Sequence, residues 1–302
     1  MTITWGEILA GAALDLALGD PRWLPHPVRA FGWLAARLEP FWRSRIRNLR
    51  LAGAVFWTST VATACGVVLL TLPWANIYWV WMLLAIRDLD VEATAVLRRL
   101  EAGDLAGARS MLARIVGRDT GSLEEPEILR AVVETVAENL NDAIVAPLFY
   151  LMLAGPVGMA AYKAINTLDS MVGYRSERYR EFGWFPARMD DLANWAPARL
   201  TAGLVWIAAL ALPGYHFRRS VRVTWRDASS QPSPNAGFPE AALAGALGVR
   251  LGGLNYYGGV PHPKPYLGDP ERALARAAFA RTRVMLYAVA ILMLAAACGM
   301  TA

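Results

Sequence analysis

The chain has 302 residues, of which 56% are hydrophobic and 18% charged, and its formal net charge is +5. Soluble domains carry about 45–50% apolar and about 25% charged residues, so this composition argues against an ordinary soluble protein and for a membrane protein. Basic residues flank apolar runs, as in residues 42–50, which favours anchoring at the cytoplasmic face of a membrane over nucleic-acid binding.

Apolar segments open and close the chain. Residues 1–21 lack a basic leader and carry Glu7 and Asp15, so we expect a retained helix and not a cleaved signal. Residues 51–72 are the clearest candidate span, with 22 uncharged residues where about 20 suffice to cross a bilayer. Pro73 ends this run, residues 74–86 stay apolar for one more short pass, and residues 284–300 form the last uncharged segment.

Two further apolar runs are weaker candidates. Residues 143–165 are long enough to cross, but Gly155-Pro156 and Gly158 interrupt their middle. Residues 200–212 form an apolar run of only 13 residues, closer to a core or re-entrant helix. The sequence therefore predicts an all-α polytopic membrane protein with about four to five apolar helices, some broken or re-entrant, in one domain over residues 1–302.

The polar segments raise a question of topology. Residues 87–141, 166–199 and 215–283 all contain several arginines, so all three favour the cytoplasm. A full crossing by residues 143–165 would place the first two on opposite sides. Two half-helices that turn at residues 153–158 would keep them on one side, and broken helices are tolerated where they line a buried or water-filled cavity. Both arrangements remain open at this point.

Three carboxylates follow one another at helical spacing in the motif ETVAENLND. Glu134, Glu138 and Asp142 would lie on one face of an α-helix, where like charges repel unless a cation or a basic partner lies beside them. Magnesium binds carboxylate oxygens together with substrate phosphates, so a metal site is one reading. A solvated acidic face is the other.

A second polar group occupies residues 163–174, KAINTLDSMVGY, directly after an apolar run. Lys163 and Arg175 are suited to holding phosphate, and Asp169 to binding a metal or accepting a proton. Asn166 and its neighbours would equally serve as ordinary helix caps.

Two later stretches have the same mixed character. Residues 187–199 combine paired carboxylates with arginines. This combination suits binding of metal and phosphate, or a salt-bridged loop. The candidate site residues in this stretch are Arg188, Asp190, Asp191 and Arg199. Residues 227–259 are rich in turn-forming residues and in glycines. The glycine amides could bind an anion, or the stretch could be a plain loop. The candidate site residues there are Ser233, Asn235, Gly252 and Gly253. There is no P-loop motif, no G-x-S-x-G elbow and no CxxC pair.

Eight ordered blocks together resemble one family, the adenosylcobinamide-phosphate synthases (the CbiB/CobD proteins of cobalamin biosynthesis). The resemblance covers about residues 10–270. The blocks are GDPRWLPHPVRAFG, VGRDT, ETVAEN-x-x-D, APLFY, AYKAINTLDSMVGY, ARMDDLANWAPARL, SPNAGFPEAALAGALGVRLGG and NYYGG. The chain departs from the family at Gln231, where a histidine often precedes the Ser-Pro-Asn run.

The resemblance implies a multi-pass enzyme of the cell inner membrane whose active site faces the cytoplasm. Such an enzyme is an ATP-dependent amide ligase that joins adenosylcobyric acid to (R)-1-amino-2-propanol phosphate, or to the free alcohol. ATP and Mg²⁺ are implied as cofactors and membrane lipid as surroundings. A homo-oligomer or an association with other corrinoid enzymes is left open, and no nucleic-acid partner is expected.

On that reading, the candidate residues receive roles. Metal binding is expected at Glu134, Glu138 and Asp142; acid–base and phosphate chemistry at Lys163, Asp169, Asp190 and Asp191; substrate binding at Asn166, Arg175, Arg188, Arg199, Ser233, Asn235, Gly252 and Gly253. A transporter for a corrinoid or another anionic small molecule is the main alternative, since broken helices and intramembrane charges also mark transport pathways. A non-catalytic membrane scaffold is the third.

Overall fold

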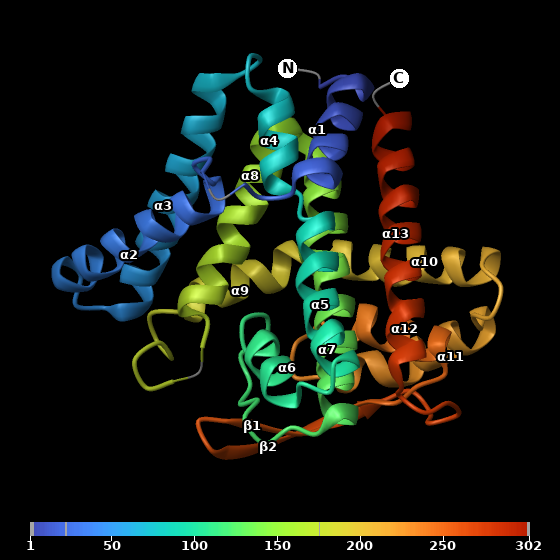
Figure 1. Cartoon of the computed structure of the whole chain (residues 1–302). Helices are drawn as coiled ribbons and strands as arrows, with labels where there is room; N and C mark the ends of the chain where they lie inside the picture. Colours follow the sequence, from blue (N-terminus) through green and yellow to red (C-terminus); the bar gives the residue numbers. More distant parts are fainter. Residues whose placement is uncertain (1–2, 22, 175, 301–302) are drawn as a thin grey trace. The chain divides into compact units, whose positions relative to one another are not determined.

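The computed structural model describes residues 3–21, 23–174 and 176–300, and most of its regular structure is helical (Figure 1). The predicted all-α membrane class is confirmed, with one small β-hairpin in addition. The chain forms two compact units that alternate along the sequence. Unit 1 comprises Met1–Ala85, Asp142–Trp195 and Leu294–Ala302, and unit 2 comprises Ile86–Asn141 and Ala196–Met293. The single domain expected over residues 1–302 stays a prediction.

Unit 1 is built from six helices within its described residues, and one close approach between its segments occurs at a glycine. Its helices are α1 (Trp5–Leu18), α2 (Pro27–Arg45), α3 (Leu49–Thr71), α4 (Asn76–Leu83), α8 (Ala146–Val172) and α9 (Trp184–Ala193). Helix α3 packs against α2 and α8, and α1 packs against α4. A Cβ atom at Gly53 would lie 1.9 Å from the main-chain oxygen of Phe182, so no larger residue fits this contact. Phe56 and Phe182 pack beside it in a buried aromatic core.

Unit 2 combines shorter helices with the hairpin. It contains α5 (Ile86–Glu101), α6 (Leu105–Leu112), α7 (Glu125–Asn139), the 3-10 turn η2 (Ala228–Ser230), α11 (Phe217–Asp227), α12 (Gly237–Leu247), β1 (Leu251–Tyr257), β2 (Val260–Leu267) and most of α10 (Trp195–Ala211) and α13 (Arg276–Gly299). Helix α7 buries Ile128, Val132 and Val136 at helical spacing, and Leu140 directly after it is buried as well.

The hairpin replaces the loop expected around residues 248–259. Strands β1 and β2 pair antiparallel, and Tyr257 faces Val260 across the turn. Gly258 and Gly259 form this two-residue connection with φ of 58° and 78°. Positive φ at both positions is what the tight hairpin turn requires, and glycine adopts it without steric cost. These glycines therefore turn the chain.

Three helical stretches are long and apolar enough to cross a membrane among the described residues: Leu49–Thr71, Glu125–Val172 and Arg276–Gly299. The shorter apolar helix Trp195–Ala211 adds a fourth apolar element. The short pass expected after Pro73 is the eight-residue helix α4.

Helix α8 folds back on itself at the predicted break. Ala154 and Gly155 leave the helical conformation, with φ of −143° and +62°. Tyr150 and Tyr162 nevertheless stack, with ring centroids 5.3 Å apart and rings 11° from parallel. Twelve residues of straight α-helix would separate them by about 18 Å. The two halves of α8 therefore form a helical hairpin, the second of the two arrangements that the sequence left open. Gly158 permits the close approach, since its Cβ would lie 2.4 Å from the main-chain oxygen of Tyr150.

Candidate functional site

The π-helix η1 (Leu140–Val145) places Asp142 within reach of the second half of the α8 hairpin. The Tyr162 hydroxyl lies 3.1 Å from Asp142 Oδ1, and Asn166 Nδ2 donates to Asp142 Oδ2 at 3.2 Å. Lys163 Nζ donates to the main-chain oxygen of Asp142 at 3.1 Å. Three polar side chains of α8 thus converge on one residue that precedes the hairpin in the chain.

Helix α9 adds a second carboxylate, Asp190. Asn166 Nδ2 lies 3.4 Å from Asp190 Oδ1, and Asn194 Nδ2 donates to Asp190 Oδ2 at 3.0 Å. Asn194 Oδ1 in turn lies 2.9 Å from the Tyr162 hydroxyl. This ring of contacts, all within unit 1, is named the α8–α9 polar cluster; its members are Asp142, Tyr162, Lys163, Asn166, Asp190 and Asn194.

Negative charge is concentrated in the α8–α9 polar cluster. Burial raises the pKa of Asp190 well above its ordinary range, and the charges of Asp142 and Asp169 raise it further. Hydrogen bonds from Asn194 and Asn166 act in the opposite direction. Like charges at this range are stabilised by a nearby cation, so the cluster is suited to a positively charged ligand.

A magnesium ion fits this cluster by its donor chemistry. Mg²⁺ is usually held by one or two carboxylates together with water and substrate phosphates. Asp142 and Asp190 supply two carboxylates joined by one amide, and Lys163 supplies a positive charge for a phosphate beside them. Among the residues that the structure describes, no group of three or more His, Cys, Asp or Glu side chains is arranged as a metal site. Phosphate and water would therefore complete the coordination.

The structure separates the three carboxylates that the sequence placed on one helical face. Helix α7 ends at Asn139, and the wider turn of η1 then changes the spacing before Asp142. Glu134 and Glu138 belong to unit 2, whereas Asp142 belongs to unit 1. The three do not share one α-helical face, because the chain changes helix type between them.

Glu134 is held by a basic partner in unit 2. Its side chain is 3% exposed, and Arg118 Nη2 donates to its Oε2 at 2.5 Å. The Gly252 amide donates to Oε1 at 2.8 Å, and Arg118 Nη1 donates to Asn255 Oδ1 at 2.8 Å. Both carboxylate oxygens of Glu134 therefore already have protein donors, which explains how this charge is kept inside the unit.

A second buried carboxylate of unit 2 was not among the predicted site residues. Glu240, on α12, is 2% exposed, and burial raises its pKa to about 8, with a further contribution from Glu138. Lys264 acts in the opposite direction on Glu240. Burial also disfavours the charged form of Lys264, but the negative charges of Glu240 and Glu138 outweigh it and raise the pKa of the lysine.

The glycine pair on β1 has a structural reason for being glycine. Gly252 and Gly253 have φ of 81° and 97°, and a Cβ at Gly252 would lie 2.1 Å from the main-chain oxygen of Pro265. The Gly252 amide donates to Glu134 Oε1, and the Gly252 carbonyl accepts from Arg130. Anion binding by this pair stays a prediction, and the Gly252 amide already has an acceptor.

Ser233 and Asn235 lie before α12 in unit 2. Ser233 Oγ accepts from the amides of Asn235 and Ala236 at 3.3 and 3.2 Å, which orders the turn. Arg199 Nη1 donates to Asn235 Oδ1 at 3.4 Å, and its guanidinium stacks 4.1 Å from the Phe238 ring centroid. The structure thus brings Arg199 and Asn235 together, and substrate binding by this pair stays a prediction.

The remaining candidates are more peripheral. Arg188 is 65% exposed and lies 3.7 Å from Asp191, one helical turn along α9. Arg175 lies outside the described residues. Four members of the α8–α9 polar cluster are predicted site residues, namely Asp142, Lys163, Asn166 and Asp190, and their roles stay predictions; Tyr162 and Asn194 were not predicted. Each has a visible signal, since Tyr162 directly precedes Lys163 and Asn194 follows Asp190 by one α-helical turn.

Comparison with known proteins gives one consistent result. The family model described as CobD/Cbib protein matches residues 8–286. A Geobacter metallireducens protein named "Cobalamin biosynthesis protein CobD" is 46% identical over 312 residues, which covers 100% of this chain and 98% of that protein. Proteins of the same name from Pelobacter propionicus and Clostridium perfringens are 47% and 42% identical, with 93% and 89% of this chain covered and 90% and 89% of theirs.

No solved structure matches the chain. The family model nevertheless extends over both compact units, from α1 into α13. It therefore includes the α8–α9 polar cluster of unit 1 and the Arg118–Glu134 pair of unit 2. The chain belongs to the CobD/Cbib protein family.

Proposed function

We propose that this member of the CobD/Cbib family acts in cobalamin biosynthesis as an ATP-dependent amide ligase of the cell inner membrane, with its active site facing the cytoplasm. Its substrates are the propionate carboxylate of adenosylcobyric acid and the amine of (R)-1-amino-2-propanol phosphate or of the free alcohol. Family membership supports the pathway. The observation that carries the ligase chemistry is the pairing of Asp142 and Asp190 beside Lys163.

The reaction divides into two balanced steps. The propionate oxygen attacks the terminal phosphorus of ATP, which forms an acyl phosphate and releases ADP. The amine nitrogen then attacks the acyl carbon, the C–O bond to phosphate breaks, and an amide and inorganic phosphate result. The ammonium form of the amine must lose one proton before attack, and a second proton leaves the nitrogen as the amide forms.

The α8–α9 polar cluster and residues outside it would meet these requirements. Lys163 would hold a transferring phosphate as a point charge, and Asp142 with Asp190 would hold magnesium. Bound there, magnesium would neutralise phosphate charge. Asp169, whose charge acts on Asp190, would accept a proton from the amine. Arg199 with Asn235 would bind an anionic group of a substrate.

Product formation tests the proposal directly. Purified protein in detergent is incubated with adenosylcobyric acid, ATP, Mg²⁺ and each candidate amine, and the product mass is recorded. We expect adenosylcobinamide or its phosphate, with ADP released only when both the acid and the amine are present. Absence of amide product with a folded protein and both amines would overturn the ligase proposal.

A transporter remains the alternative because the broken α8 hairpin and its buried charges are also typical of transport pathways. It predicts substrate flux into vesicles without amide formation. A scaffold predicts neither activity, and substitutions in the α8–α9 polar cluster would then be silent.

A further inference from the structure

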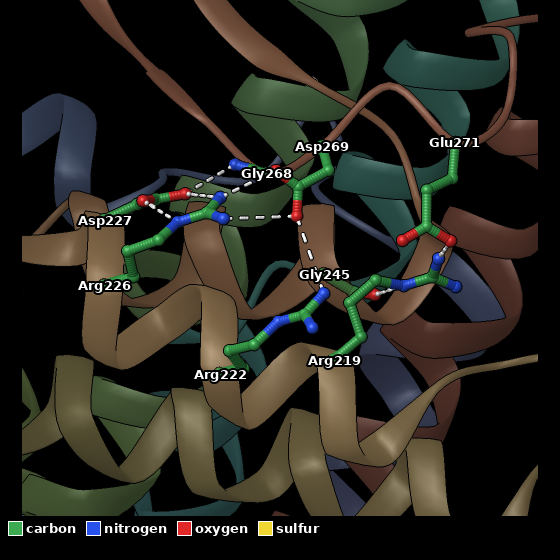
Figure 2. Close-up of polar contacts among 8 residues, drawn as sticks. All are labelled: Arg219, Arg222, Arg226, Asp227, Gly245, Gly268, Asp269 and Glu271. Atoms are coloured by element: carbon green, nitrogen blue, oxygen red, sulfur yellow. Dashed lines mark hydrogen bonds and ion pairs between the residues drawn. The ribbon is translucent and has the colours of Figure 1, made fainter.

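Helix α11 carries arginines beside a pocket in unit 2. Arg222 lies four residues after Arg218 and three after Arg219, so the three arginines share one side of the helix. With His216 and Glu271 they line a pocket of about 610 Å³. Figure 2 shows two of these arginines, Arg219 and Arg222, and the acidic residues that face them.

Arg219 has an incomplete set of partners. It is 8% exposed, its Nε donates to the main-chain oxygen of Gly245 at 3.0 Å, and its Nη1 pairs with Glu271. Its Nη2 is buried and has no hydrogen-bond partner within the described part of the chain. Buried donors in native structures are almost always paired, so this nitrogen points to an acceptor brought by a ligand.

The other arginines of α11 differ in how far they are neutralised (Figure 2). Arg226 donates to Asp227 at 2.6 and 2.8 Å and to Asp269 at 3.0 and 3.3 Å. Arg222 reaches Asp269 only at 3.7 Å, beyond hydrogen-bond range, and its side chain is 63% exposed. Arg218 is exposed as well. The pocket is therefore lined by three guanidinium groups and one carboxylate, that of Glu271, and its charge is positive.

The rest of the lining is apolar or aromatic and comprises Leu210, Tyr215 and Phe217. A volume of about 610 Å³ is larger than an inorganic anion needs and suits a small organic molecule. Guanidinium groups bind phosphate through paired hydrogen bonds. We propose that this pocket binds a phosphate ester, with the phosphate on Arg219 and Arg222 and the organic part against the apolar lining.

Two sources supply such a ligand. The apolar helix α10 ends at Ala211, six residues before α11 begins, so a phospholipid headgroup at the membrane surface is one source. A soluble phosphorylated metabolite is the other. The site uses none of the residues assigned above to the ligase reaction, and its test needs no turnover.

Binding is measured on the full-length protein with two probes. Native mass spectrometry counts phosphatidylglycerol retained from mixed phosphatidylglycerol–phosphatidylcholine micelles, and calorimetry follows (R)-1-amino-2-propanol phosphate. The variants are Arg219→Gln, Arg222→Gln and Glu271→Gln. Arg250→Gln is the matched control, because Arg250 is exposed in the same unit and stacks on Tyr266 outside the pocket.

We expect one probe to bind the wild type, and Arg219→Gln or Arg222→Gln to weaken it roughly tenfold. Glu271→Gln removes the competing carboxylate and should tighten binding, a gain that a misfolded protein would not give. The probe that responds identifies the source. Equal binding by all variants, an equal loss in Arg250→Gln, or no binding of either probe to the wild type would overturn the proposal.

Discussion

Asp142 and Asp190 come from different segments of unit 1, yet one amide nitrogen, Asn166 Nδ2, lies 3.2 Å from the first carboxylate and 3.4 Å from the second. Such an arrangement concentrates negative charge around a single neutral donor. Burial is the largest cause of the raised pKa of Asp190, the nearby charge of Asp142 raises it further, and the hydrogen bond from Asn166 lowers it. The arrangement also identifies the residues whose substitution is most informative.

Replacing either carboxylate should remove a ligand for magnesium. We expect Asp142→Asn and Asp190→Asn each to lower the rate of amide formation by about 10²–10³, the usual loss for an electrostatic contact to the transition state. The measurement is product mass against time. Glu177→Gln is the matched control, because Glu177 is an exposed carboxylate of the same unit. A folded Asp190→Asn protein with near-normal activity would count against the assignment.

The buried pair of Arg118 and Glu134 should matter for stability. Arg118→Met leaves a carboxylate that is 3% exposed without its cation, which costs about 3–5 kcal/mol in the free energy of unfolding. Arg114→Gln breaks the exposed pair with Glu92 and should cost about 0–1 kcal/mol. Thermal unfolding in detergent compares the two variants, and equal midpoints would contradict the prediction.

Glu240 should make stability depend on pH. Its pKa is about 8 in the folded protein and about 4.3 when unfolded. The folded state therefore binds more protons between these values, so stability falls as pH rises from about 4.3 to about 8. Glu240→Gln keeps the neutral form, and its midpoint should exceed that of the wild type at pH 8.5 by more than at pH 5.5. A constant difference between the two midpoints would show that Glu240 does not titrate in this window.

The α8 hairpin should tolerate no side chain at its closest approach. A Cβ at Gly158 would lie 2.4 Å from the main-chain oxygen of Tyr150 and 2.8 Å from the Ala154 Cβ. Gly158→Val should therefore cost more than about 1 kcal/mol in the free energy of unfolding. Gly66→Val serves as control, since nothing lies within 4 Å of its added Cβ. Similar unfolding midpoints for both variants would exclude a tight hairpin.

The same hairpin predicts the topology. Cysteines at Gly121 and Arg180, both exposed and on either side of residues 142–172 in the sequence, should react from the same face of oriented vesicles. The background would carry Cys65→Ala and Cys298→Ala. Labelling from opposite faces would mean that residues 142–172 cross the membrane completely.

The sequence was most informative where a pattern is local. The uncharged run of α3 and the break at Gly155-Pro156 both follow from composition and backbone chemistry within a few residues. The polar residues of KAINTLDSMVGY were recognised for the same reason, as a dense group beside an apolar run.

What the sequence could not provide were the partners across long separations. Helical spacing grouped Asp142 with Glu134, because nothing local reveals that the helix type changes after Asn139. The pairing of Glu134 with Arg118 and the approach of Lys264 to Glu240 depend on tertiary packing. The hairpin was not predicted, since period-two alternation is weak in β1 and three prolines lie in β2.

The alternation of the two units along the chain has a consequence for synthesis. The first four helices of unit 1 leave the ribosome before residues 86–141, which belong to unit 2. Helices α8 and α9, which pack against helices of that first group, are translated only after residues 86–141. The nascent α3 therefore waits, with the face that α8 will cover still open, while more than fifty residues are translated. Contacts of such long range form slowly and leave apolar surface exposed in the interval. For this chain, the order of translation and the order of assembly must differ.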